Sequence, residues 1–399
     1  MSKPTIGVAV IGAGMAGRAH AAGYRSAATL YDADLPEVRL VAIADVNAAF
    51  AGDTARRFGY ERAESSWEDV AGAPDVDVVS VVVANHLHRP IVEGLLAGGK
   101  HVLCEKPLAP SVEDAEAMVA AARASGREAA VGFTFRRSPA IAAIREQVDQ
   151  GGIGRLLHFN GHYWCDYGCD PNGPMSWRYK GGAGSGALSD IGSHLLDLAE
   201  FVCGPIRSLR GAVLATVITE RALPLGTAVG HAAAALSDVR EPVENEDLVT
   251  FTATFASGAT GTMSASRVAY GLPNSLGFEL FGETGAATFD LARAGEIGFA
   301  DGTPPGITQG YRQVLVGPAH PYLTGGLPMD FPGVGYGQND LFSFQARAFL
   351  EQVAGLDRLP RPASFDEGVH NLRLLDAVVA SAEANGADVA VAPSPAGKD

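Results

Sequence analysis

The sequence predicts an α/β protein in which a doubly wound parallel sheet is followed by an α+β domain with an open, predominantly antiparallel sheet. In the first part, apolar runs such as TIGVAVIGAG and VDVVSVVVAN alternate with helical segments. Runs that are apolar throughout are typical of strands buried on both faces of a parallel sheet. After residue 150 the runs alternate between apolar and polar residues and are joined by glycine turns, which favours antiparallel strands.

Taken in chain order, the expected elements divide the chain into two domains. The first part contains strands at 5–14, 38–46, 76–85, 100–106 and 128–135, and helices at 15–28, 48–59, 88–99 and 111–126. Ser111 has the position of an N-cap, with Asp114 three residues later. The second part shows strand patterns at 154–164, 206–218, 246–269 and 275–291, a loop over 300–338, and helices near 339–354 and 366–385. FASGATGTM reads as a hairpin with Ser-Gly at its turn. We expect domains at 1–135 and 136–399, with the last helix packing back towards the first domain.

Composition and charge exclude several classes of partner. The chain has 399 residues and a formal net charge of −15, which repels phosphate backbones and anionic lipid surfaces. No apolar run reaches the roughly 20 residues that a membrane span needs, and no secretory signal is recognisable. The cysteines at 104, 165, 169 and 203 lack the spacing of a zinc site. We therefore expect a cytoplasmic protein with reduced thiols, no metal, and neither nucleic acid nor a membrane as partner.

A glycine motif lies between the first expected strand and the first expected helix. Gly12, Gly14 and Gly17 form G-x-G-x-x-G in this strand–turn–helix context. The first glycine allows the tight turn, the second lets the backbone approach a pyrophosphate, and the third allows close packing of helix and strand. The helix N-terminus offers amides and a positive dipole end to the phosphates. The motif predicts a dinucleotide-binding Rossmann domain, in which the turn and first helical residues contact the cofactor: Gly12, Gly14, Met15, Ala16 and Gly17.

An acidic residue at the end of the second strand indicates which dinucleotide binds. Asp45 can accept hydrogen bonds from the ribose hydroxyls and would repel a 2′-phosphate, and no arginine follows it directly. The sequence therefore favours NAD over NADP. Asp45 lies further from Gly17 than is usual, so SAATLYDADLPE must be an insertion before the second strand.

Two further segments carry residues able to do acid–base chemistry. CEKPL places Glu105 and Lys106 at the carboxyl end of an expected strand, the edge at which open α/β sheets bind ligands. GSGALSDIGSH places Asp190 and His194 four residues apart on an apolar helix, so in an α-helix they share one face. The alternatives for the Asp–His pair are a metal site, for which further ligands are lacking, or a buried polar contact.

Taken together, G-x-G-x-x-G with Asp45, then EKP, then G-A-L-x-D-x-x-x-H resembles the Gfo/Idh/MocA family of NAD(P)-dependent sugar and inositol oxidoreductases. DPNGPMSWRY and GPAHPY resemble its branch of levoglucosan and glycoside 3-dehydrogenases. The resemblance implies that Lys106, Asp190 and His194 are catalytic and that the Lys106–Pro107 peptide is cis. It implies further cofactor contacts beyond the glycine turn and Asp45, namely Asn85, His88, Glu105, Lys106, Trp177 and Arg178.

We expect His194 to take the proton of a secondary alcohol, because an unperturbed imidazole titrates near neutral pH. Lys106 would stabilise the developing alkoxide, and Asp190 would position the sugar or His194. Aromatic faces with carboxylates suit a pyranose. The segments FTFRRSP and HYWCDYGCD supply such groups, and the expected substrate residues are Phe135, Arg136, Tyr163, Trp164, Asp166, Asp190 and His194.

The predicted activity is NAD-dependent oxidation of a secondary ring hydroxyl of a sugar, glycoside or amino-sugar unit to a ketone, with C3 of a pyranoside and aminoglycoside or other natural-product tailoring among the possibilities. Three alternatives stay open: an inositol dehydrogenase, a glycoside hydrolase that retains NAD, and a sugar-responsive regulator. The regulator predicts loss of the catalytic lysine or histidine, and both are present. An open sheet face favours association, so we expect a homodimer or homotetramer.

Overall fold

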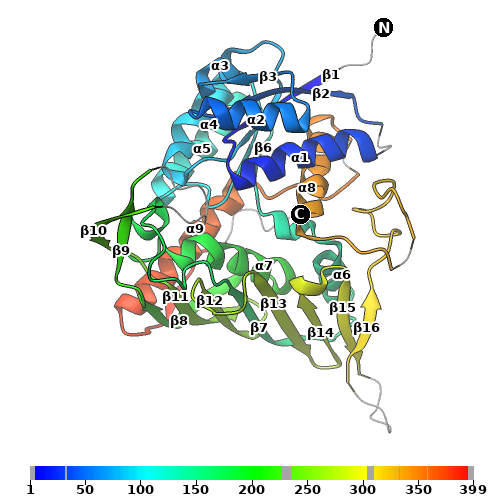
Figure 1. The fold of residues 1–399 in the computed structure, drawn as a ribbon. Helices are drawn as coiled ribbons and strands as arrows, with labels where there is room; N and C mark the ends of the chain where they lie inside the picture. The colour runs from blue at the N-terminus through cyan, green and yellow to red at the C-terminus, as the bar shows by residue number, and fades with distance from the viewer. Residues whose placement is uncertain are drawn as a thin grey trace. The chain divides into compact units, whose positions relative to one another are not determined.

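The computed structural model describes residues 5–31, 34–226, 235–302, 310–331, 333–356 and 358–393. Parts of the expected loop over 300–338, and residues 32 and 33 of the expected insertion, lie outside the described residues. The chain forms two compact units, each made of two segments: residues 1–139 with 317–369, and residues 140–316 with 370–399. Figure 1 gives the labels used below.

The first unit contains the predicted parallel sheet. Its six strands lie in the order β3-β2-β1-β4-β5-β6, and every neighbouring pair is parallel. The strands are β1 (Thr5–Ile11), β2 (Glu37–Ala44), β3 (Arg62–Glu64), β4 (Val78–Val81), β5 (His101–Cys104) and β6 (Ala129–Val131). The order in which strands are added reverses between β1 and β4, because β2 and β3 lie on one side of β1 and β4, β5 and β6 lie on the other. This is the point where doubly wound sheets bind ligands. The predicted fold class is confirmed.

The helices of the first unit lie in two groups, α1, α2 and α8 in one and α3, α4 and α5 in the other. Their bounds are α1 (Met15–Leu30), α2 (Ala48–Phe58), α3 (Trp67–Gly72), α4 (His88–Ala97), α5 (Val112–Ser125) and α8 (Gln338–Val353), with one-turn helices η1 (Asn85–Leu87) and η2 (Thr134–Arg137). Ser111 caps α5 as expected, because its Oγ accepts from the Asp114 N–H at 3.1 Å.

The segment 317–369 belongs to the first unit, whereas the sequence alone places it in the second domain. Helix α8 packs on α1 so closely that a Cβ on Gly23 would lie 2.8 Å from the Phe342 carbonyl oxygen. The core of this unit includes Phe349 and Leu350 of α8 beside Tyr24 of α1. These contacts join residues more than 300 positions apart, which local sequence patterns do not reveal.

The second unit is built on a nine-stranded sheet in the order β16-β15-β14-β13-β7-β12-β11-β8-β17. Only β7 and β12 are parallel neighbours among its described strands. These strands are β7 (Leu156–Trp164), β8 (Ile206–Ala215), β11 (Leu248–Phe255), β12 (Thr260–Ser266), β13 (Ser275–Gly282), β14 (Gly285–Asp290), β15 (Glu296–Asp301), β16 (Arg312–Leu315) and β17 (Val389–Ala390). The predicted hairpin is β11–β12, with Gly258 at a φ of 87° in its turn. Strand β16 lies where the sequence predicts only a loop.

The remaining elements of the second unit are mostly helical, and Figure 1 shows α7 running along one face of the large sheet. They are α6 (Pro139–Asp149), η3 (Trp177–Tyr179), the π-helix η4 (Leu188–Gly192), α7 (Ser193–Cys203), the two-stranded pair β9 (Glu220–Pro224) and β10 (Leu236–Pro242), η5 (Leu291–Arg293) and α9 (Phe365–Glu383), whose first residues are assigned to the first unit. Strand β7 alternates, so Phe159 and Tyr163 are buried while Asn160 and His162 are more exposed. From residue 159 onwards the odd-numbered residues therefore face α7, where a Cβ on Gly161 would lie 3.0 Å from the Leu195 side chain.

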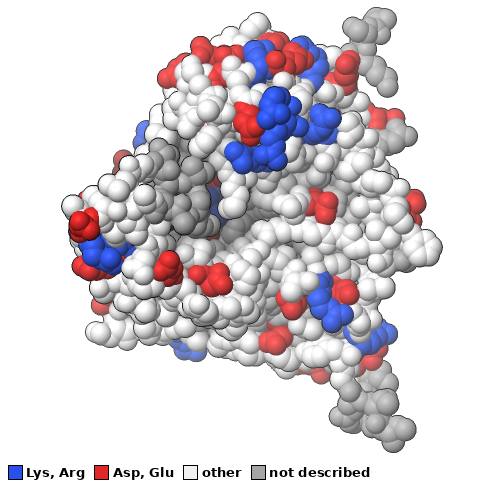
Figure 2. Space-filling view, viewed as in Figure 1, with Lys and Arg blue, Asp and Glu red and all other residues white. Residues whose placement is uncertain are grey.

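The surface carries charges of both signs. Figure 2 shows acidic and basic side chains interspersed on the visible face, rather than one continuous basic stripe. On α2, for example, Arg56 and Arg57 both pair with Asp53. No helix among the described residues has the length and apolar character needed to cross a membrane.

Candidate active site

The three glycines of the first turn have three different structural roles. Gly12 has a φ of 102°, and a Cβ there would lie 2.1 Å from the Val82 carbonyl oxygen. A Cβ on Gly17 would lie 1.8 Å from the Gly12 carbonyl oxygen. Gly14, by contrast, has no atom within 4 Å of its Cβ position. The turn and the helix packing therefore require Gly12 and Gly17, while Gly14 leaves open space where the sequence predicts a pyrophosphate.

The N-terminus of α1 is available to an anion. Gly14 is its N-cap residue, no side chain caps it, and its first turn has no acidic residue. The Arg18 N–H donates to the Gly14 carbonyl at 3.0 Å, which leaves the amides of Met15, Ala16 and Gly17 in the first turn without helical acceptors. The residues here thus fit the phosphates of a dinucleotide.

Asp45, which follows β2, is tied directly to the glycine turn. Its Oδ2 accepts from the Ala13 N–H at 2.7 Å, and its Oδ1 accepts from the Asn47 N–H at 2.8 Å. Each carboxylate oxygen keeps a second lone pair, so the group can still accept from ribose hydroxyls. The neighbouring Val46 is 96% exposed. Asp45, which is predicted to bind the ribose, is therefore hydrogen-bonded to the glycine turn, which is predicted to bind the phosphates.

Glu105 and Lys106 follow β5 at the same edge of the sheet. Glu105 Oε1 lies 2.9 Å from Nε2 of His20, and Oε2 accepts from the Lys106 N–H at 3.1 Å. Burial by itself would raise the pKa of Glu105, but the hydrogen bond from His20, together with the charge of Lys106, lowers it below its usual range. The Lys106–Pro107 peptide is cis, as the resemblance implied. His20 is not among the residues that the sequence predicts for the site.

Asn85 and His88 lie just beyond β4, in η1 and at the start of α4. His88 is 1% exposed, and its two ring nitrogens lie 3.1 Å from the carbonyl oxygens of Leu108 and Val83. Burial lowers the pKa of His88. His88 therefore joins the segment after β4 to the segment after β5 at the edge of the sheet. Asn85, by contrast, is half-buried and more accessible.

Phe135 and Arg136 lie in η2, after β6. Phe135 is buried, and Arg136 forms an ion pair with Glu367 of α9 at 2.5 Å. The Arg136 guanidinium also lies 5.6 Å from the centroid of the Phe133 ring. Both predicted substrate residues therefore stand at the edge of the parallel sheet that holds Glu105 and Lys106.

In the second unit, Asp190 lies in the π-helix and His194 in the first turn of α7. Both are half-buried, whereas Ile191, Gly192 and Ser193 between them are buried. The spacing predicts a continuous α-helix; the structure instead has a π-helical segment at Asp190, an element that occurs frequently at functional sites. Neither side chain belongs to the apolar core.

Two tyrosines approach this pair from β7 and the segment after it. The ring centroids of Tyr163 and His194 are 6.1 Å apart, and the Tyr167 hydroxyl donates to Asp190 Oδ2 at 2.7 Å. Burial, and then the charge of Asp190, raise the pKa of Tyr167 well above its usual value, so it stays a donor. Tyr167 is absent from the predicted site, although its segment was recognised as aromatic and acidic.

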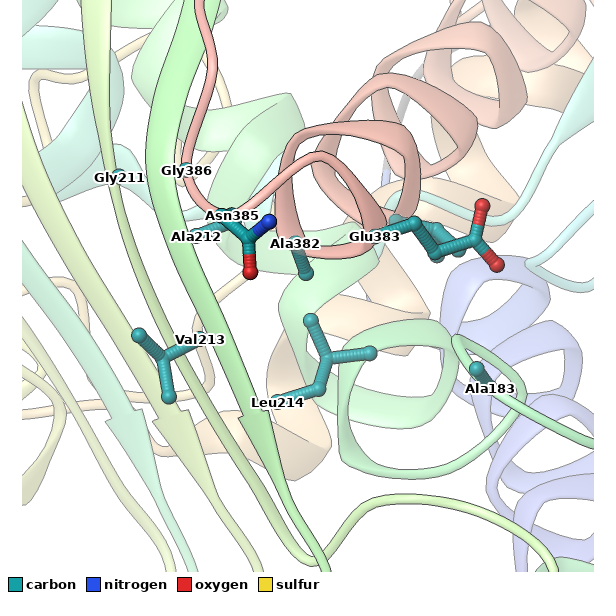
Figure 3. A pocket seen from close by; sticks show the side chains of 10 residues that line it. Ala183, Gly211, Ala212, Val213, Leu214, Ala382, Glu383, Asn385 and Gly386 are labelled. Atoms are coloured by element: carbon teal, nitrogen blue, oxygen red, sulfur yellow. The ribbon is translucent and has the colours of Figure 1, made fainter.

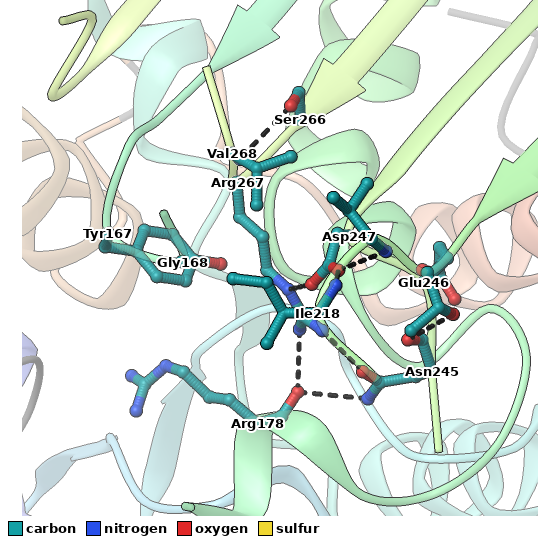
Figure 4. Close-up of polar contacts among 12 residues, drawn as sticks. Tyr167, Gly168, Arg178, Ile218, Asn245, Glu246, Asp247, Ser266, Arg267 and Val268 are labelled. Atoms are coloured by element: carbon teal, nitrogen blue, oxygen red, sulfur yellow. Dashed lines mark hydrogen bonds and ion pairs between the residues drawn. The ribbon is translucent and has the colours of Figure 1, made fainter. Parts of the chain in front are cut away.

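A buried polar hub, which we define as Asn245, Glu246, Asp247 and Arg267, holds the segments around Asp190 (Figure 4). The Arg267 side chain donates to Asp247 Oδ1, to Asn245 Oδ1 and to the Arg178 carbonyl, each within 2.8–2.9 Å. Glu246 accepts from the N–H groups of Gly184 and Leu188 at 2.8 and 2.9 Å. The hub thus fixes the start of the π-helix through hydrogen bonds to its backbone.

Trp177 and Arg178 lie in η3, whose backbone the hub holds. The Arg178 guanidinium is 4.5 Å from the centroid of the Trp177 ring, which is 52% exposed. Figure 4 shows the Arg178 side chain directed away from the hub while its carbonyl points into it. These two side chains remain predicted cofactor contacts.

Trp164 lies on the other side of the sheet from the Tyr163–His194 pair. Successive strand residues face opposite sides of a sheet, so Trp164 lies on the face opposite to α7, where it stacks on His162 with ring centroids 3.9 Å apart. It lines a cavity of about 330 Å³ on that face. Asp166 is half-buried in the segment after β7. The geometry therefore gathers Tyr163, but not Trp164, with the predicted catalytic residues of this unit.

Another cavity of the second unit, of about 550 Å³, lies between β8 and the end of α9 (Figure 3). Its lining is mostly apolar, with Val213 and Leu214 on one side and Val379 and Ala382 on the other. None of the predicted site residues lines it. Among the described residues, no group of three His, Cys, Asp or Glu side chains could hold a metal ion.

Comparison with known proteins gives a family match for each of two segments of the chain. Residues 6–133 match the model of the Gfo/Idh/MocA oxidoreductase family with an NAD-binding Rossmann fold, and residues 141–288 match the C-terminal domain of that family. The levoglucosan dehydrogenase of Pseudarthrobacter phenanthrenivorans is 38% identical over 386 residues, which cover 94% of this chain and 96% of that protein. The D-apiose dehydrogenase of Paraburkholderia graminis is 28% identical over 65% of this chain and 60% of its own.

Solved structures agree with these relatives. Levoglucosan dehydrogenase in complex with NADH superimposes with a TM-score of 0.87 at 33% identity, covering 98% of this chain and 100% of that one. An oxidoreductase domain protein from Kribbella flavida gives a TM-score of 0.87 at 34% identity over the same shares. The expectation of NAD as cofactor is confirmed. The chain belongs to the Gfo/Idh/MocA family of oxidoreductases and carries that family's NAD-binding Rossmann domain.

Proposed function

We propose that this protein oxidises a secondary ring hydroxyl of a sugar, a glycoside or an amino-sugar unit to a ketone, with NAD as the oxidant. One observation carries the proposal: Asp190 and His194 are half-buried side chains on either side of three buried residues, with Tyr163 and Tyr167 beside them. The names of the relatives support a sugar substrate, since they include a levoglucosan dehydrogenase and a D-apiose dehydrogenase.

In this proposal each unit supplies a distinct part of the chemistry. His194 takes the proton of the hydroxyl as general base, a role worth about 10²- to 10⁴-fold in rate. Asp190, held by the Tyr167 hydroxyl, orients the sugar or the His194 ring. Lys106 donates a hydrogen bond that stabilises the negative charge developing on the oxygen.

The cofactor would be held by residues that the geometry suits to it. The Met15, Ala16 and Gly17 amides would bind the pyrophosphate, and Asp45 would accept from the ribose hydroxyls. NAD, when bound, supplies the acceptor for the hydride that leaves the sugar carbon. Glu105 is the acidic group nearest in sequence to Lys106, and we assign it to the nicotinamide end of the site.

The first test is NADH formation with NAD, and separately with NADP, over a panel of sugars. The panel contains simple pyranoses and their methyl glycosides, levoglucosan as a 1,6-anhydrosugar, inositols and aminoglycosides. We expect NADH from one pyranoside class and little or no NADPH. Product analysis then identifies the oxidised carbon, for which C3 is the position that we propose.

Other outcomes of the same panel would point to the competing functions. Activity on inositols alone would make the protein an inositol dehydrogenase. Cleavage of an aryl glycoside without net NADH would make it a hydrolase that retains NAD. NADH binding without any turnover would contradict the proposed function and favour a sugar-responsive regulator.

We also propose that the protein is a homodimer or homotetramer. The face of the nine-stranded sheet opposite to α7 presents Trp164 and Phe281 among polar side chains, and Phe281 is 38% exposed. Exposed apolar side chains grouped on a sheet face favour association. Light scattering after size-exclusion chromatography measures the mass directly, and a monomer would contradict this proposal.

A further inference from the structure

A chain of four side chains leads from the interior of the first unit to Glu105. Tyr24 OH lies 3.0 Å from Ser80 Oγ, Ser80 Oγ lies 3.1 Å from His20 Nδ1, and His20 Nε2 lies 2.9 Å from Glu105 Oε1. Tyr24 and Ser80 have no exposed surface, and His20 is 2% exposed. Buried polar groups arranged in this way are costly unless every member is satisfied.

One direction of donation satisfies every member of the chain. If Tyr24 donates to Ser80, Ser80 to His20 Nδ1, and His20 Nε2–H to Glu105, each hydroxyl and the neutral imidazole use their donors once. All the donors then point towards the carboxylate. Because the chain ends at the fully buried Tyr24, it offers no route for a proton to reach water, so it supports Glu105 rather than conducting protons.

The surroundings of Glu105 leave its carboxylate little freedom. A Cβ on Gly132 would lie 2.5 Å from Oε1, so only glycine allows the carboxylate to lie there. The second oxygen accepts from the Lys106 N–H at 3.1 Å. His20 on one side and the Lys106 backbone on the other therefore fix the carboxylate immediately before the proposed catalytic lysine.

We propose that His20 is a positioning residue of the active site: by donating to Glu105 it keeps that carboxylate ionised and in one orientation, and thereby holds the backbone of Lys106. The inference rests on the proposed function, in which Glu105 and Lys106 belong to the site. His20 itself need not touch substrate or cofactor, and it acts through Glu105.

The charged and titratable groups around Glu105 determine how the proposal depends on pH. They are His20 from α1, Lys106 beside it, Cys104 from β5 and His88 from α4. The Glu105 pKa is lowered in the presence of His20, so the ionised form is lost only as the pH falls through that lowered value. Without His20, burial raises the Glu105 pKa, and the ionised form is lost at a higher pH.

The test compares His20→Leu, which removes the donor, with His20→Gln, whose amide can still donate to Glu105. Ser80→Ala is the second route, because it keeps His20 but frees its ring, and it serves if His20→Leu does not fold. The matched control is His101→Asn at the other end of β5, where His101 Nδ1 accepts from the Glu128 N–H at 3.0 Å. Each variant is assayed for sugar oxidation between pH 5 and 9 and titrated with NADH over the same range.

We expect His20→Leu to lower kcat/KM about tenfold or more, the usual effect of losing a hydrogen bond to a charged group, and to move the acid limb of the pH profile upwards. Ser80→Ala should give a smaller shift in the same direction, His20→Gln should recover most of the activity, and His101→Asn should match the wild type. Rates and pH profiles unchanged in His20→Leu and Ser80→Ala would overturn the proposal. So would equal losses in the Leu and Gln variants with no shift of the acid limb.

The experiment separates this inference from the proposed function. If the wild type binds NADH but oxidises no sugar of the panel, the proposed function fails. The pH dependence of NADH binding, compared between the wild type and the His20 variants, then still tests the positioning role of His20. If the wild type oxidises a sugar and the variants keep its pH profiles, the function stands and the role of His20 is refuted.

Discussion

The glycine turn of the first unit and the Asp190 helix of the second are positioned in contrasting ways. In the turn the motif's own glycines pack against each other, with Gly17 against Gly12, and two residues 32 and 70 positions further along the chain, Asp45 and Val82, complete the contacts. The Asp190 helix depends on distant residues, since Glu246 accepts from backbone groups 62 and 58 positions earlier in the chain. The glycine motif therefore contains residues that contact one another, whereas the Asp190 motif is held by buried residues that lie outside it in the sequence.

The largest expected effect separates chemistry from cofactor binding. His194→Ala should lower kcat about 10³-fold, because the general base is removed, while NADH affinity stays within about twofold of the wild type. Steady-state kinetics and NADH titration measure the two quantities. His162→Ala is the control. His162 lies in β7 on the face of the nine-stranded sheet opposite to α7, which carries His194, and it stacks on Trp164. Turnover retained by His194→Ala would remove His194 from the mechanism.

The next effect tests whether the second region depends on its hub. Arg267 and Asp247 pair at 2.8 Å with side-chain exposures of 1% and 0%. Breaking a buried pair costs about 3–5 kcal/mol, so Arg267→Leu should destabilise the second unit by that amount and lower activity. Arg155→Leu breaks an exposed pair with Glu283 and should cost less than about 1 kcal/mol. Denaturant unfolding compares them, and similar losses would show that the hub contributes no more than a surface pair.

Two glycine variants test the different roles of Gly14 and Gly17 in the turn of the first unit. Gly17→Ala should destabilise the first unit by about 2 kcal/mol through overpacking, because its Cβ has no space. Gly14→Ala should fold normally and weaken NADH binding about tenfold, equivalent to about 1.4 kcal/mol, because its Cβ occupies the space predicted for the pyrophosphate. Thermal unfolding and NADH titration distinguish the two. The reverse pattern would contradict the different roles assigned to these glycines.

The smallest effect concerns a single hydrogen bond. Tyr167→Phe removes the donor to Asp190 Oδ2 and should lower kcat/KM about tenfold, within the usual range for a bond to a charged group. NADH affinity and the unfolding midpoint should change little. Should kcat/KM stay at the wild-type value, the Tyr167–Asp190 contact would have no part in catalysis.

The same contrast explains what the sequence could predict. The parallel sheet, the glycine turn, the Ser111 cap and the β11–β12 hairpin each follow from residues close together in the chain. The opposite orientations of Tyr163 and Trp164 could also have been predicted, because both lie in one strand pattern. His20 could have been noticed as a polar residue one turn after Gly17. Neither the hub around Arg267 nor the π-helix at Asp190 could be inferred, since both depend on pairings between distant segments.

The packing of α8 on α1 has a consequence for how the polypeptide acquires its structure during synthesis. Residues 140–316 lie between the two segments of the first unit, so Phe349 and Leu350 reach the core around Tyr24 only after those residues have been synthesised. At 5–20 residues per second this delay lasts roughly 10 to 40 s. The nascent first unit spends that interval with the α1 surface uncovered. A recombinant nucleotide-binding fragment should therefore join residues 1–139 to 317–369, rather than end where the parallel sheet ends.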